Sequence, residues 1–167
     1  MIIKKTKIPF IQTATIGMLP SFLKKMVYRA KGYKIGKGVS IGLGSVLIGK
    51  NVTVGDNTQI GLLTVIRAKN IRIDDFVQIG SFTFIDTETL EVGEDTRIRE
   101  QVYVGGLSGP DSLLKLGKRC TVMQLTYINP VKPIIIGDDS GIGGHCLLFT
   151  HGSWLNQLDG YPVTFAP

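Results

Sequence analysis

Residues 35–66 read IGKGVSIGLGSVLIGKNVTVGDNTQIGLLTVI, and in them an aliphatic residue followed by a small residue returns about every six positions. The same spacing continues along the chain as far as Leu148. The aliphatic residues in phase are Ile35, Ile41, Ile48, Val54, Ile60, Ile66, Ile73, Ile79, Ile85, Val92, Ile98, Val104, Leu116, Val122, Ile128, Ile136, Ile142 and Leu148. A short fixed period is typical of a solenoid whose strands stack coil upon coil. The sequence therefore predicts an all-β protein built as a parallel β-helix.

The residue two places before each aliphatic residue supports the same phase. It is small, β-branched or aliphatic throughout, as at Thr58, Thr64 and Thr83. Because alternate residues of a strand share a face, we expect both members of each pair to point into one core. Cys120 and Cys146 occupy such positions in different parts of the repeat, which argues against a disulfide between them. The residue after each aliphatic is usually Gly, Asp or Asn, so we expect the left-handed backbone of a sharp corner there.

A longer period groups the hexads into coils. Positions 35, 54, 73 and 92 are 19 residues apart, and the next intervals are 24 and 20 residues. Three hexads therefore form one turn, and we expect about six triangular coils over residues 35–148. Every extra residue after the first coil falls between a third hexad and the next first hexad, so insertions should gather along one edge. Both ends of such a column expose strand edges that need cover.

Charge is distributed unevenly along the chain. The 167 residues are enough for one domain and carry a formal net charge of +6. Ten Lys or Arg residues and no Asp or Glu precede Asp56. Such a cluster indicates an anionic partner, namely lipid headgroups, a phosphate-linked substrate or nucleic acid, or else a solvated face without a partner. No nucleic-acid-binding motif accompanies it, and we expect no nucleic acid partner.

The N-terminal basic segment, residues 1–34, is expected to contain a helix over residues 20–31. One helical stripe comprises Phe22, Leu23, Met26, Val27 and Ala30, with Lys24, Lys25 and Arg29 beside it. We expect this basic amphipathic helix to cap the N-terminal end of the column, with docking of residues 1–37 on an anionic membrane surface as the alternative. Residues 8–23 carry no charge, but they are too few and too polar to span a membrane. We expect a cytoplasmic protein, peripheral at the inner membrane face if this segment docks.

The hexads of residues 35–148 resemble those of the hexapeptide-repeat acyltransferases, which fold as left-handed parallel β-helices. The left hand is implied by this resemblance alone. Residues 149–167 resemble the active-site loop of the maltose, galactoside and capsular-polysaccharide O-acetyltransferases. In that loop a Thr-His element ends a coil and a Pro-Val pair leads back, and Thr150-His151 and Pro162-Val163 match these elements.

The resemblance implies transfer of an acetyl or related acyl group from acyl-CoA to a sugar hydroxyl or amine, in surface polysaccharide or lipopolysaccharide biosynthesis. His151 is then the general base that takes the acceptor's proton. Neutral imidazole is the competent form, so we expect activity to fall in acid. The resemblance also implies acetyl-CoA as co-substrate, no metal requirement, and a homotrimer with acyl sites between subunits.

Three further residues are candidates for binding the sugar or glycan acceptor. Trp154 and Tyr161 would supply an aromatic platform, with packing as the alternative for both. Galactoside-type enzymes place asparagines in the coil before the histidine, and residues 122–126 lack them. Asn129 is therefore expected to substitute, and a simple galactoside or maltose acceptor is disfavoured. The second histidine, His145, lies one hexad before His151 and on another corner.

Two other functions fit the same repeat. A gamma-type carbonic anhydrase needs three histidine ligands, whereas this chain has two histidines, on different corners. A non-catalytic assembly or binding protein is the other alternative. In the enzymes that the chain resembles, hexads beyond the Pro-Val pair carry much of the coenzyme A site. This chain ends at Pro167, so we expect either a truncated product or a short variant.

Overall fold

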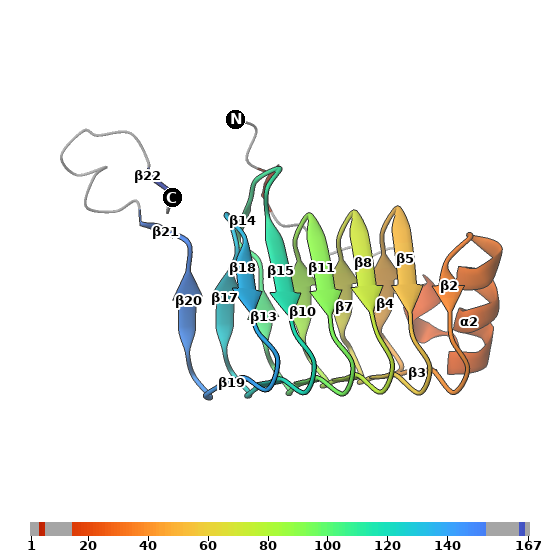
Figure 1. Cartoon of the computed structure of the whole chain (residues 1–167). Helices are drawn as coiled ribbons and strands as arrows, with labels where there is room; N and C mark the ends of the chain where they lie inside the picture. Colours follow the sequence, from red (N-terminus) through yellow and green to blue (C-terminus); the bar gives the residue numbers. More distant parts are fainter. Residues whose placement is uncertain (1–3, 6–14, 153–163, 166–167) are drawn as a thin grey trace.

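A computed structural model describes residues 4–5, 15–152 and 164–165. Within them the fold is a β-solenoid in which three parallel sheets, each of six strands, run along one axis (Figure 1). Sheet I comprises β2 (Lys34–Ile35), β5 (Asn51–Val54), β8 (Asn70–Ile73), β11 (Thr89–Val92), β15 (Leu113–Leu116) and β18 (Ile134–Ile136). Sheet II comprises β3 (Ser40–Ile41), β6 (Gln59–Ile60), β9 (Gln78–Ile79), β12 (Arg97–Ile98), β16 (Thr121–Val122) and β19 (Gly141–Ile142). Sheet III comprises β4 (Val46–Ile48), β7 (Val65–Arg67), β10 (Phe84–Asp86), β13 (Tyr103–Val104), β17 (Tyr127–Asn129) and β20 (Leu147–Phe149).

Strand pairing follows the longer period of the sequence. The residues of sheet I that lie opposite one another in successive coils are Ile35, Val54, Ile73, Val92, Leu116 and Ile136. These are the positions predicted from the 19-, 24- and 20-residue intervals. Their side chains belong to, or pack against, one continuous apolar core. The predicted register of sheet I is therefore confirmed.

One member of the predicted phase is wrong. We expected Ile48 to point inward, but Leu47 lies opposite Ile66 and Ile48 lies opposite Arg67. Leu47 is buried in the core, whereas Ile48 is only half-buried. The glycine after Ile48 imitates the hexad pattern, while the strict six-residue spacing from Ile41 indicates Leu47.

Gly42, which follows Ile41, is needed for a reason other than the expected one. Gly42 does not have a left-handed backbone, and that conformation falls two residues later, at Gly44 and, in the next coils, at Leu63 and Phe82. A Cβ atom on Gly42 would clash with the carbonyl oxygen of Gly61 in the next coil. Close approach of successive coils, rather than corner geometry, therefore selects glycine at this position.

The small residues two places before each aliphatic residue carry polar groups into the core. The Oγ1 atom of Thr64 donates to the carbonyl oxygen of Gly80 at 2.8 Å. Cys120 fills an equivalent position, and its Sγ lies 3.0 Å from the carbonyl oxygen of Gly137. Each such group satisfies a backbone carbonyl of the next coil, which explains why a purely apolar residue is not always used. The inward orientation is confirmed, and Cys120 and Cys146 are both free thiols.

Helix α2 (Ser21–Ala30) covers the open edge of the first coil (Figure 1). Three of its basic side chains donate to backbone carbonyls of that coil. The pairs are Lys24 Nζ with Gly42 O, Lys25 Nζ with Val39 O at 3.0 Å, and Arg29 Nη2 with Ile35 O at 2.8 Å. In every later coil the corresponding carbonyls face a neighbouring strand, so the side chains of α2 stand in for the absent neighbour.

Hydroxyl groups of residues 21–33 accept hydrogen bonds from backbone N–H groups of this edge. The pairs are Ile41 N with Ser21 Oγ at 3.0 Å, Leu47 N with Tyr28 OH at 2.9 Å and Gly49 N with Tyr33 OH at 3.2 Å. Helix α2 ends at Ala30, and Gly32, just beyond its C-cap, has φ of +85°, with the N–H of Tyr33 donating to the carbonyl of Tyr28 at 3.0 Å. This glycine-terminated C-cap places Tyr33 against the edge. The predicted capping role is confirmed.

The orientation of α2 differs from the one expected, since Leu23 and Val27 of the predicted apolar stripe are only half-buried. Lys24 and Tyr28 are buried against the first coil, whereas Phe22 and Met26 are exposed. A buried carbonyl without a partner costs free energy, so cationic donors with long side chains suit this edge better than aliphatic ones do. The apolar stripe predicted to pack inward therefore lies partly in solvent.

Burial of Tyr28 predicts a loss of stability at high pH. Burial raises the pKa of Tyr28 to about 12, above the ordinary tyrosine value near 10, so the neutral form stabilises the fold fully below pH 10. Between pH 10 and about 12 the free energy of unfolding should fall by about 1.4 kcal/mol per pH unit. Burial lowers the pKa of Lys24, which makes stability rise with pH, but only below about pH 10.4. Denaturant unfolding of the parent and of Tyr28→Phe, compared over this range, should show the slope only in the parent; equal slopes would contradict it.

The extra residues between coils gather along one edge, as expected. We call this the III–I edge, because it consists of the segments that join sheet III to sheet I. They are residues 49–50, 68–69, 87–88, 105–112 and 130–133, and residues 150–152 continue the edge after the last strand of sheet III. Within it β14 (Leu107–Ser108) pairs antiparallel with β1 (Lys4–Lys5). A short 3-10 helix, η1 (Ile16–Met18), precedes α2, and the described part of the chain holds no helix long and apolar enough to cross a membrane.

Candidate active site

His151 lies at the III–I edge, directly after the last strand of sheet III. It begins β21 (His151–Gly152), which pairs antiparallel with β22 (Thr164–Phe165). His151 lies opposite Phe165, so the chain leaves the coil at His151 and later returns beside it. The imidazole is half-buried. Because β22 pairs with β21, the backbone around His151 is held by a strand pair and is not a simple turn.

Thr150 fastens the backbone of His151 to the preceding coil. Its Oγ1 atom accepts a hydrogen bond from the N–H of Lys132 at 2.9 Å and donates to the carbonyl oxygen of Asn129 at 3.3 Å. Its N–H donates to the same carbonyl at 3.4 Å. A hydroxyl that both donates and accepts is needed for this arrangement, which gives a physical reason for threonine before His151.

A ladder of aromatic rings on the outer face of sheet III ends at His151. Ring centroids lie 5.1 Å apart from Phe84 to Tyr103, 5.1 Å from Tyr103 to Tyr127 and 5.3 Å from Tyr127 to Phe149. The imidazole of His151 then meets Phe149 edge-on, at 6.0 Å and 73°. Because the stacked rings occupy one another's faces, the ladder is better suited to orienting His151 than to stacking a sugar.

Asn129 lies beside this ladder, in the coil before that of Phe149, and the two residues are opposite one another. Only 4% of its surface is exposed. Gly106, from the 105–112 segment, packs over its side chain, and a Cβ atom on Gly106 would lie 2.7 Å from Asn129 Nδ2. The structure thus brings Asn129 to the edge that carries His151 but covers its amide. An acceptor could reach that amide only if the segment moved.

Sequence reasoning missed an ion pair that joins two insertions of this edge. Lys132 Nζ lies 3.2 Å from Asp111 Oδ2, so the pair connects residues 130–133 to residues 105–112. Both side chains are substantially exposed, and such a pair contributes at most about 1 kcal/mol. Its effect is positional, since Lys132 is also the donor to Thr150. In the sequence, the signal for this contact is that both segments are insertions on the edge that reaches His151.

The remaining candidates do not join this cluster in the described residues. Trp154 and Tyr161 lie outside the residues that the structure describes. His145 is exposed, with φ of 56°, in the turn before β20, whereas His151 follows the end of that strand. The two histidines therefore stand on different edges, as the hexad spacing predicts.

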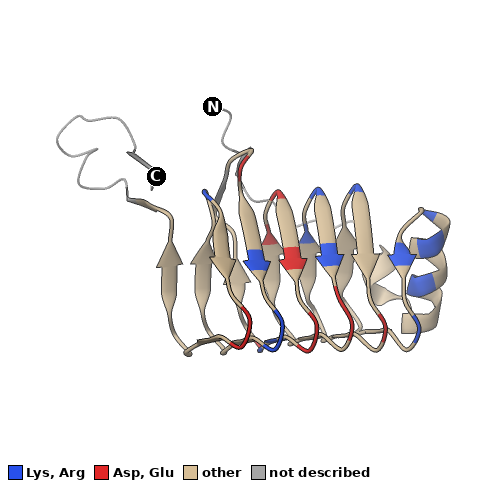
Figure 2. Cartoon of the chain, viewed as in Figure 1, with Lys and Arg blue, Asp and Glu red and all other residues tan. Residues whose placement is uncertain are grey.

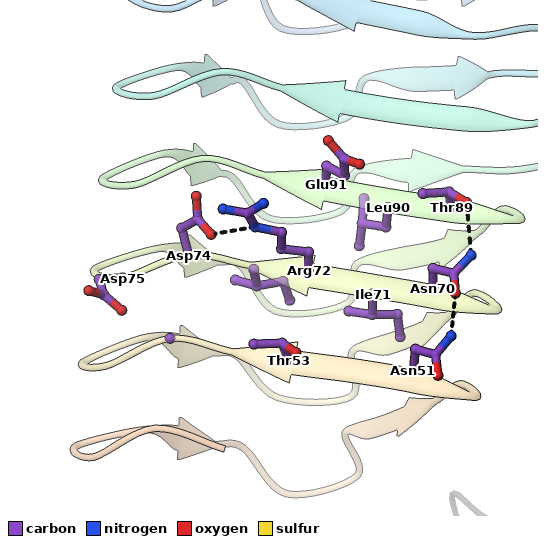
Figure 3. A pocket seen from close by; sticks show the side chains of 12 residues that line it. Asn51, Thr53, Asn70, Ile71, Arg72, Asp74, Asp75, Thr89, Leu90 and Glu91 are labelled. Atoms are coloured by element: carbon purple, nitrogen blue, oxygen red, sulfur yellow. Dashed lines mark hydrogen bonds and ion pairs between the residues drawn. The ribbon is translucent and has the colours of Figure 1, made fainter. Parts of the chain in front are cut away.

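A hollow of about 500 Å³ lies elsewhere, on the outer face of sheet I (Figure 3). Several of its polar side chains bond to one another: Asn51 Nδ2 donates to Asn70 Oδ1 at 2.7 Å, and Asn70 Nδ2 lies 3.4 Å from Thr89 Oγ1. Arg72 Nε donates to Asp74 Oδ1 at 3.0 Å. These ladders explain the surface as part of coil stacking, and no residue predicted for the site lines it.

Within residues 4–5, 15–152 and 164–165, no group of three or more His, Cys, Asp or Glu side chains is placed to hold a metal ion. Comparisons with protein-family models, with curated proteins and with solved structures found no match to this chain. The features that bear on function are therefore the solenoid, the III–I edge and the Thr150-His151 and Pro162-Val163 motifs of the sequence.

Proposed function

We propose that this protein transfers an acetyl or related acyl group from acyl-CoA to a hydroxyl or amine of a sugar, in the synthesis of a surface polysaccharide or lipopolysaccharide. One observation carries the proposal: His151 stands where the regular coil ends, half-buried, beside a returning strand. It also stands on the edge that collects the insertions of the repeat, and irregular segments on a rigid scaffold are common places for binding and catalysis.

In this reaction neutral His151 accepts the proton of the acceptor group as its oxygen or nitrogen attacks the thioester carbonyl. Collapse of the tetrahedral adduct breaks the carbon–sulfur bond, and the proton held by His151 passes to the departing thiolate. The products are the acylated sugar and coenzyme A with a free thiol. Thr150 and Phe149 contribute by fixing the backbone and the ring of His151.

The same proposal includes a left-handed solenoid with triangular coils that assembles as a homotrimer. Three sheets per turn are compatible with that cross-section. Leu63, Phe82 and Leu125 are exposed on the turns between sheets II and III, with φ of 50°, 57° and 58°. A bulky side chain in the left-handed region costs about 1–2 kcal/mol, and its exposure to water adds to that cost. A second copy covering this row would offset the exposure, and light scattering that shows a monodisperse monomer would contradict the trimer.

The proposed reaction is tested by following release of the coenzyme A thiol from acetyl-CoA with a panel of sugar acceptors. We expect release that depends on both the protein and the acceptor, with the acyl group recovered on the sugar by mass spectrometry. Absence of turnover together with absence of coenzyme A binding would contradict the proposal and favour a non-catalytic assembly or binding protein. Binding without turnover on one acceptor would direct the test to the other acceptors of the panel, and failure on all of them would contradict sugar acylation.

A further inference from the structure

The outer side of the N-terminal helix carries an apolar surface that the solenoid does not use. Phe22 and Met26 are spaced four residues apart on α2 and are 61% and 64% exposed. We call these two residues the outer face of α2. The helix forms one end of the molecule (Figure 1), and by helical periodicity these two residues lie on the side opposite to Lys24 and Tyr28, which are buried against the first coil. Met18, in the 3-10 helix η1 that precedes α2, is 62% exposed as well. Large apolar side chains exposed on one side of a terminal helix indicate a surface that a partner covers.

The charges around this face are all of one sign. Lys31, Lys34 and Lys37 are exposed on the helix end and the first coil, and Figure 2 shows that acidic residues begin only in later coils. Asp56 is the first acid in the sequence. The cations of α2 that cap the first coil, Lys24, Lys25 and Arg29, already bond to its carbonyls. Capping and contact with a partner therefore use different side chains of the same segment.

This charge pattern distinguishes between two occupants. A second copy docked through the same face would bring two strongly basic ends together without an acid between them, which is unfavourable. An anionic bilayer suits both kinds of side chain. Its acyl chains can surround the apolar side chains, and its phosphate groups can contact the lysines.

We propose that the protein docks on an anionic membrane through the outer face of α2, with Phe22 and Met26 entering the acyl region and the exposed lysines contacting headgroups. The column of coils then stands with its first coil at the lipid surface and His151 at its far end (Figure 1). This docking is independent of the proposed acyl transfer and can be tested without it.

The experiment is sedimentation of the whole chain with vesicles of phosphatidylcholine alone or with added phosphatidylglycerol. We expect the parent to bind the anionic vesicles. The double variant Phe22→Ser, Met26→Ser should bind them about tenfold more weakly or worse, because it removes less apolar surface from water on docking. A matched control is Ile135→Ser, which removes an apolar side chain that is 65% exposed on sheet I. It should bind as the parent does.

A second variant, Lys31→Glu with Lys34→Glu, should reduce binding to the anionic vesicles at low salt, because its charges are reversed near the headgroups. Both variants change exposed side chains, so their unfolding transitions should match that of the parent. Equal binding by parent and Phe22→Ser, Met26→Ser, or no binding to either vesicle, would overturn the proposal. Self-association of the parent that the same double variant abolishes would also overturn it, in favour of a second copy.

Discussion

Replacement of His151 by alanine is expected to lower kcat/KM for acyl transfer about 10²- to 10⁴-fold, the usual contribution of a positioned general base. Without the imidazole the acceptor must lose its proton to water as it attacks the thioester, which raises the barrier. The imidazole has no role in the core or the cap, so the free energy of unfolding should change by less than about 1 kcal/mol. In the parent the rate should fall in acid, since protonated imidazole cannot accept the proton.

His145→Ala is the matched control for this variant. It removes the same kind of side chain from an exposed turn on another edge, and its rate of thiol release should equal that of the parent. Coenzyme A binding, measured by calorimetry, should persist in His151→Ala, because the change removes the base rather than the donor site. Thiol release that is unchanged in His151→Ala would contradict the catalytic assignment.

Replacement of Leu47 by alanine is expected to lower the free energy of unfolding by about 2–5 kcal/mol. Leu47 is 2% exposed in the continuous core, so its truncation leaves a cavity between the first two coils. Those coils also carry the α2 cap, and the Leu47 N–H donates to Tyr28. Loss of packing there should loosen the helix together with the coil. Denaturant unfolding followed by circular dichroism measures the effect.

The adjacent variant, Ile48→Ala, separates this register from the one-residue alternative. Ile48 lies opposite Arg67 and is half-buried, so its truncation should cost about 1 kcal/mol or less. The two variants remove comparable apolar side chains at neighbouring positions of one strand. A larger loss of stability in Ile48→Ala than in Leu47→Ala would place the inward residue of β4 at position 48.

The register of the solenoid was predictable because a repeat encodes it directly. Residues that stack in successive coils must be separated by the length of one coil, so counting intervals between aliphatic residues locates every strand of sheet I. The error at Ile48 arose because Gly49 was given more weight than spacing. The aromatic ladder obeys the same rule, since Phe84, Tyr103 and Tyr127 are separated by 19 and 24 residues. The sequence therefore contains the signal for the ladder.

Other features depend on the assembled coil and have no signal in a local stretch of sequence. The face that α2 turns inward is decided by unpaired carbonyls of the first coil, such as that of Gly42, which exist only after the coil has formed. The need for glycine at position 42 likewise comes from the backbone of a residue 19 positions later. The burial of Asn129 depends on Gly106, which lies on a different insertion. A pattern of apolar residues contains none of this information.

The hydrogen bonds between α2 and the first coil also bear on how such a chain avoids forming fibrils. An uncovered parallel strand edge is a template on which another polypeptide can add strands, and repetition of that step builds a cross-β filament. Lys24, Lys25 and Arg29 occupy the acceptors of that template, so strand addition cannot begin at this end. Insertion of a hexad between α2 and β2 would therefore separate the helix from the edge that it protects.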